Sequence, residues 1–170
     1  MAIVRKWDYT SLADFDDPDD YRPNSELAIV IDPGRPAGDF VAGLTVFYER
    51  IGPGDRIPLH QHTVEEVFFL DSGTIEVTLG EDRETIEPGA VVFIPARVAH
   101  GFRNVGGGIA RIHAVFPSPE VTIRYLERNP APGTENDQPG SPLALNVRQL
   151  LEGDAEGAIR PLSEEEFSSA

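Results

Sequence analysis

Residues 27–117 form a series of short apolar runs that turn residues interrupt every few positions. The interrupting segments are rich in glycine, proline, aspartate and asparagine, which favour tight bends. Many short strands at this spacing are typical of a sandwich or a barrel. No helical stretch of 10–15 residues separates the runs in the sequence, so parallel βαβ units are not expected. The sequence therefore predicts an all-β domain.

The rest of the chain flanks this domain, and 170 residues fit one domain with extensions. We predict an acidic N-terminal arm over 1–26, a β-barrel over 27–128, and a proline- and glycine-rich loop with a helical tail over 129–170. In the tail, Asn146 is a candidate helix cap, and Ser163 with Glu166 forms a capping-box pattern. The aspartates of the arm lack the glycine of a calcium loop, so we interpret them as a solvated loop.

Composition restricts the partners and the chemistry. The net charge of −15 argues against nucleic acid and anionic membranes as partners, because both are polyanions. The chain has no cysteine, so a metal would need histidine and carboxylate ligands. Neither a signal peptide nor a membrane span is visible, and we expect a cytoplasmic protein. The arm could add a strand to a neighbouring copy, so we expect a homodimer.

Three of the four histidines fall in two segments that are candidates for a metal site. On an extended strand His60, His62 and Glu66 share one parity, whereas Glu65 does not. Antiparallel pairing could bring His100 to them. Three imidazoles and one carboxylate suit Fe, Mn, Ni, Cu or Zn. Spacing alone leaves open a second reading, in which the two nearby histidines are polar residues on a wet strand face.

The two segments also resemble the conserved motifs of the cupin superfamily. The first, 54–73, resembles the pattern G-x5-H-x-H-x3-E-x6-G, and the second, 89–104, resembles G-x5-P-x-G-x2-H-x3-N. The matching residues are Gly54, His60, His62, Glu66, Gly73, Gly89, Pro95, His100 and Asn104. Arg97 is the single departure, since the pattern has glycine there. The resemblance covers about 36–117.

This resemblance implies a cupin-type double-stranded β-helix, a jelly-roll barrel, to which the chain adds its arm and short C-terminal helices. It also implies one divalent transition metal, of unknown identity, held by His60, His62, Glu66 and His100. The three motif glycines are expected in turns with positive φ or tight bends. If position 97 also needs a positive φ, arginine is strained there. Arg97 either binds an anionic substrate group at the barrel mouth or is a solvated turn residue.

Four further residues are candidates for the pocket, although alternation does not decide which strand face points inward. Phe68 and Phe102 share the parity of the metal ligands and either contact the substrate or belong to the core. His113 and Tyr48 either exchange protons with a substrate or are ordinary barrel residues.

Three functions remain open for a pocket of this kind, which suits a small organic molecule. With Fe, Ni or Cu we expect a metal-dependent oxygenase that acts on a small enolic or aromatic compound. With Zn or Mn we expect a cyclase, isomerase or lyase instead. The third reading is a binding protein without catalysis. The two enzyme readings are favoured, and the oxygenase is our first hypothesis.

Overall fold

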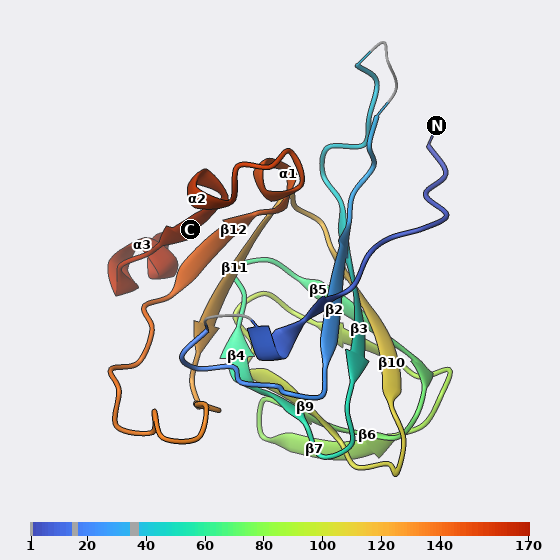
Figure 1. The fold of residues 1–170 in the computed structure, drawn as a ribbon, viewed down its shortest axis with the longest axis vertical. Coiled ribbons are helices and arrows are strands. Elements are labelled where there is room, and N and C mark those ends of the chain that lie inside the picture. Colours follow the sequence, from blue (N-terminus) through green and yellow to red (C-terminus); the bar gives the residue numbers. More distant parts are fainter. Residues whose placement is uncertain (1, 15–16, 35–37) are drawn as a thin grey trace.

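Two antiparallel sheets face each other in the computed structural model, which describes residues 2–14, 17–34 and 38–170 (Figure 1). The six-stranded sheet has the order β1 (Thr10–Ser11), β2 (Glu26–Val30), β3 (Thr45–Ile51), β10 (Ala110–Phe116), β5 (Glu66–Ser72) and β8 (Val91–Ile94). The seven-stranded sheet has the order β13 (Ile159–Pro161), β12 (Leu143–Asn146), β11 (Glu120–Tyr125), β4 (Arg56–Gln61), β9 (His100–Asn104), β6 (Ile75–Leu79) and β7 (Asp82–Ile86). The predicted all-β jelly roll is confirmed.

Apolar side chains fill the space between the sheets at one end of the fold. A buried cluster includes Ile51, Phe68, Leu70, Ile75 and Ile112, which come from four strands. These residues alternate with more exposed ones along their strands, as expected for sheets that bury one face. Ile112 of this cluster also lines a cavity between the sheets, so the core continues into the cavity wall.

The motif glycines occupy turns, as predicted. Gly54, Gly73 and Gly89 have φ values of 82°, 93° and 94°. At Gly73 a Cβ would lie 2.7 Å from Cα of Ala110, so a larger residue would collide with the neighbouring backbone. The turn that leads into β6 can therefore pass close to β10 only because this position lacks a side chain.

The tail contains the two helices expected after Asn146 and Ser163, and also a third helix and two strands that the sequence did not indicate. The helices are α1 (Val147–Leu151), α2 (Ala155–Ala158) and α3 (Glu164–Ser169). The side chain of Asn146 caps α1, and Ser163 and Glu166 form the predicted capping box of α3. Strands β12 and β13 extend the seven-stranded sheet beside these helices (Figure 1). Phe167 of α3 packs with Ala144 and Leu162 in a small core of its own.

The N-terminal arm folds back onto the same chain. It contains β1 and a single 3₁₀ turn, η1 (Leu12–Asp14), and Trp7 stacks on Tyr48 of β3 with ring centroids 4.4 Å apart. Backbone hydrogen bonds tie Asp19 and Tyr21 to Asn129. The arm thus packs against the β-domain of its own chain. The homodimer stays a prediction. Among the described residues, no helix is long and apolar enough to cross a membrane.

Candidate metal centre

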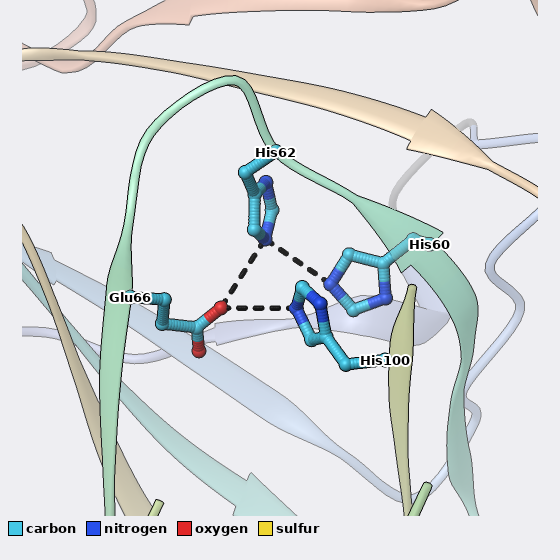
Figure 2. Close-up of side chains that lie close together, drawn as sticks. All are labelled: His60, His62, Glu66 and His100. Carbon is cyan, nitrogen blue, oxygen red and sulfur yellow. Dashed lines mark hydrogen bonds and ion pairs between the residues drawn. The ribbon is translucent and has the colours of Figure 1, made fainter. Parts of the chain in front are cut away.

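The four predicted ligands come from three strand ends that meet between the sheets (Figure 2). His60 lies near the end of β4, and His62 follows that strand directly. Glu66 begins β5, and His100 begins β9 opposite His60 in the antiparallel register. One ligand atom from each residue lies within 4.8 Å of the others, and all four residues are buried. The predicted choice of Glu66 over Glu65 agrees with this grouping.

The backbone fixes the orientation of each imidazole. Nδ1 of His60 lies 2.7 Å from the carbonyl of Pro58, and Nδ1 of His100 lies 2.9 Å from that of Val98. Nδ1 of His62 lies 2.5 Å from the carbonyl of Thr122. A carbonyl only accepts, so in each neutral ring Nδ1 carries the proton and donates it. Every Nε2 therefore presents a lone pair to the centre of the cluster, which is the usual arrangement of a metal-binding histidine.

These lone pairs lie close together, and a positive charge between them would stabilise the arrangement. Nε2 of His60 lies 3.1 Å from Nε2 of His62, a contact in which neither atom has a proton to donate when both rings are neutral. The Oε2 atom of Glu66 lies 3.3 Å from Nε2 of His62 and 3.1 Å from Nε2 of His100. A divalent cation would satisfy all four donors at once, and the donor set suits a transition metal. The residues present thus fit a metal ion.

Burial and neighbouring charges set the protonation of this cluster. Burial lowers the pKa of His60 well below its ordinary value, and the adjacent His100 and His62 lower it further. Burial alone would raise the pKa of Glu66, but its close contacts with the rings of His100 and His62 outweigh burial and lower that pKa below its ordinary value. These contacts are hydrogen bonds only when an Nε2 atom carries a proton. The neutral imidazole and the carboxylate are the forms that bind a metal.

Arg97 has the positive φ that the motif comparison left open. It has a φ of 66°, the one positive φ of a residue other than glycine among those described. Its backbone N–H donates to the carbonyl of His62 at 2.8 Å. Its guanidinium donates to the carbonyl of Phe167 at 3.2 Å and to that of Ala170. Arg97 therefore joins the His62 segment to the C-terminal helix α3 rather than reaching a substrate in the cavity.

A cavity of about 280 Å³ opens from the metal ligands between the two sheets. His60, His62 and Glu66 contribute to its wall. Most of the remaining wall is apolar and includes Leu27, Ile29, Phe47, Phe102, Ile112, Phe116, Val121 and Leu145. The volume lies close to the lower limit of ordinary ligand pockets, about 300 Å³. A small, largely apolar molecule fits this space.

Two of the predicted pocket residues belong to the other face of the six-stranded sheet. His113 and Tyr48 lie opposite each other on β10 and β3, with ring centroids 5.3 Å apart. His113 also stacks on Phe69 at 4.5 Å, and its Nδ1 lies 3.0 Å from Oδ2 of Asp71. Their strand neighbours Glu49 and Ile112 point to the cavity instead. The structure therefore separates His113 and Tyr48 from the metal ligands.

The two phenylalanines stack on each other, with centroids 4.2 Å apart and rings nearly parallel. Phe68 is fully buried in the core, whereas Phe102 also forms part of the cavity wall. Phe102 thus remains a candidate for substrate contact, and Phe68 packs against its ring within the core.

The sequence reasoning missed a buried ion-pair cluster in the cavity wall. Arg22 of the arm donates to Glu49 of β3 at 2.5 Å and to Asp20 at 2.7 Å. The signal that could have revealed Glu49 is its parity on β3, where it alternates with apolar residues on a buried face. Arg22 and Asp20 gave no comparable signal, since the acidic arm resembles a solvated loop.

Comparison with known protein families agrees with the geometry of the centre. The family model described as "Cupin domain" matches residues 47–116, which include all four candidate metal ligands. These residues form a cupin domain. The two histidine motifs, the turn glycines and the two-sheet architecture are therefore features of one superfamily, as the sequence resemblance implied.

Curated proteins that match this chain come from streptomycetes, and each match covers only part of both chains. An uncharacterized protein of Streptomyces coelicolor is 37% identical over 59 residues, which are 35% of this chain and 55% of the relative. A protein of Streptomyces cyaneus named polyketide synthase CurC is 31% identical over 94 residues, which are 54% of this chain and 60% of the relative. The chain thus spans about half the length of the curated relatives it matches.

Among solved structures, a cupin-superfamily protein from Silicibacter pomeroyi, named a sugar phosphate isomerase, has a TM-score of 0.54. The superposition covers 86% of this chain and 85% of that one at 16% identity. A similarity at this level of identity supports the fold and does not extend to the activity.

Proposed function

We propose that this cupin is a metal-dependent oxygenase that acts on a small enolic or aromatic compound. The observation that carries the proposal is the convergence of three Nε2 lone pairs and one carboxylate at the base of a largely apolar cavity. When bound there, Fe, Ni or Cu supplies Lewis acidity and redox chemistry. The chain's own residues hold the imidazoles in the binding tautomer, keep Glu66 ionised and surround the substrate with apolar walls.

The substrate class follows from the walls of the cavity. Apolar side chains favour a ring or an unsaturated chain over a sugar or another highly hydrated molecule. An enol or phenol has an oxygen atom that can approach the cationic end of such a cavity. The name of the relative CurC supports this class, because polyketides contain carbonyl groups that enolise readily.

A non-oxidative cyclase, isomerase or lyase is the second candidate. The observation that favours it is the presence of Asp20 and Glu49 in the cavity wall, since carboxyl groups can move protons to and from a substrate. These residues take the role that the sequence suggested for His113 and Tyr48.

A single screen separates the two candidates. Purified protein is analysed for metal, loaded separately with Fe(II), Ni, Cu, Mn and Zn, and incubated with a panel of enols and catechols. We expect about one metal per chain, and oxygen consumption by at least one of the Fe, Ni or Cu forms. Product formation under argon by the Zn or Mn form would replace the oxygenase with the non-oxidative enzyme. Silence of all five forms on the panel would overturn both.

A further inference from the structure

A second polar site lies in the wall of the same cavity, outside the metal ligands. It consists of Arg22 with its two ion-pair partners, Asp20 and Glu49, and of Tyr125. The first three residues are only 5–8% exposed. The ring centroid of Tyr125 lies 6.2 Å from that of His60, and its hydroxyl lies 3.4 Å from Oδ2 of Asp20. One tyrosine side chain therefore separates the two polar groups of the cavity.

The second site has both a donor and an acceptor without partners. Arg22 uses its two terminal nitrogens for Glu49 and Asp20, and its Nε has no hydrogen-bond partner among the described residues. Within the same part of the chain, Oδ1 of Asp20 also has none. A buried polar atom without a partner costs about 1–3 kcal/mol, so most such atoms in proteins are satisfied by something. These two atoms belong to neighbouring side chains that both line the cavity.

The charge of the site indicates what it accepts. Two carboxylates surround one guanidinium, so the group carries a net negative charge when all three are ionised. Burial raises the pKa of Asp20, and Glu49 raises it as well, although Arg22 opposes this shift. A carboxylate or a phosphate on the ligand would therefore be repelled. A neutral hydroxyl can donate one hydrogen bond and accept another, which matches the free acceptor and the free donor.

The site is held rigidly enough to recognise a ligand. Backbone hydrogen bonds from Tyr21 to Asn129 and from Asn129 to Asp19 are both 2.7 Å long. Asp19 also forms an ion pair with Arg128. The arm segment that carries Asp20 and Arg22 is thus attached to the chain that follows β11, and Glu49 is fixed on the sheet. A preorganised pair of this kind loses little entropy when it binds a hydroxyl.

We propose that Asp20 and Arg22 bind a neutral hydroxyl group of the substrate, at a distance from the atoms that meet the metal. The proposal rests on the proposed function, because the metal centre anchors the other end of the molecule. The substrate is then a compact, largely apolar molecule with two polar ends, an enolic or phenolic oxygen at the metal and an uncharged hydroxyl at Asp20. This description excludes phosphorylated sugars and other substrates with an anionic distal group.

Three related catechols test the site in the zinc-loaded protein, since zinc binds catechol without oxidising it. The compounds are 4-phenylcatechol, its derivative with a hydroxyl at the far end of the second ring, and the corresponding carboxylate. We expect calorimetry to show that the hydroxyl compound binds about tenfold more tightly than 4-phenylcatechol, as for a hydrogen bond to a charged group. The carboxylate should bind more weakly than 4-phenylcatechol.

The Asp20→Asn variant should lose most of the preference for the hydroxyl while it keeps its affinity for 4-phenylcatechol. The matched control is Asp82→Asn, which removes the same charge from an exposed position on β7 and should keep the tenfold preference. If Asp20→Asn does not fold, the comparison of the three compounds on the native protein still decides. Equal binding of the hydroxyl compound and 4-phenylcatechol overturns the second site alone. Failure of all three to bind overturns the proposed metal-centred function as well.

Discussion

The four histidines of the chain occupy two environments on opposite faces of the six-stranded sheet. His60, His62 and His100 are buried, and their Nδ1 atoms lie against backbone carbonyls. His113 has a side chain that is 24% exposed, and its Nδ1 lies against the carboxylate of Asp71. A backbone carbonyl accepts from Nδ1 and so fixes one tautomer and one orientation of a neutral ring, whereas the carboxylate beside His113 belongs to a side chain that is 46% exposed. The partner of Nδ1, more than the residue type, distinguishes a ligand from a packing residue.

The largest expected effect on metal content comes from removal of two of the three buried histidines. In the double variant His62→Ala, His100→Ala we expect the metal content to fall from about one ion per chain to nearly none, because half of the donors are gone. Elemental analysis after dialysis measures this loss.

His113, which lies away from the metal cluster, provides the control for that variant. His113→Ala should keep its metal and lose only about 1 kcal/mol of unfolding free energy, because it removes stacking on Phe69 and Tyr48. Metal that stays tightly bound in the double variant would disprove the centre. Metal loss in His113→Ala would instead show that the two faces of the sheet are not independent.

Acid should destabilise the metal-free protein through the buried His60. The folded state lowers the pKa of His60, so as the pH falls below about 6.5 the unfolded chain takes up a proton there that the folded chain does not. This group therefore contributes full stability above its unfolded pKa and loses it as the pH falls through the folded pKa. The loss is at most about 1.4 kcal/mol per pH unit for one proton.

Urea unfolding at several pH values measures this loss. His60→Gln should have a shallower decline of stability between pH 6.5 and pH 5 than the native protein. The groups that face His60 are His62, His100, Glu66 and Tyr125, and all of them remain in the variant. Equal slopes in the native protein and in His60→Gln would contradict the assignment.

The sequence predicted the inner histidines well because their positions depend on local rules. Strand parity and turn glycines fix how His60, His62 and Glu66 project, and a single antiparallel pairing brings His100 opposite His60. The helix caps at Asn146 and Ser163 were predictable for the same reason, since each cap involves residues three positions apart.

The rest depended on contacts between distant parts of the chain. On β3 Glu49 shares its parity with the buried Thr45 and Ile51, but alternation alone left open whether this set or that of Tyr48 points inward. The cavity wall also needs the ion pair from Arg22 to Glu49, which spans 27 positions and has no local pattern. Strands β12 and β13 exist because the tail pairs with the sheet, and their sequences alone are too short to indicate this.

The smallest expected effect, on the free energy of unfolding, concerns Arg97, which contacts the His62 segment but is not one of the four candidate ligands. Arg97 holds His62 through its backbone and α3 through its guanidinium, in a conformation with a φ of 66°. Both Arg97→Ala and Arg97→Gly remove the guanidinium contacts, but only glycine relieves the strain of a Cβ at positive φ. We expect the glycine variant to be about 1 kcal/mol more stable than the alanine variant in urea unfolding.

Both variants should keep their metal, because the backbone N–H that reaches His62 is still present. Equal stability of the two variants would show that the turn relaxes out of its positive φ when the arginine is lost. Loss of metal from both variants would show that the position of His62 depends on the contact between the Arg97 guanidinium and α3. Metal binding by the four candidate ligands would then depend on the C-terminal tail as well as on the strands that carry them.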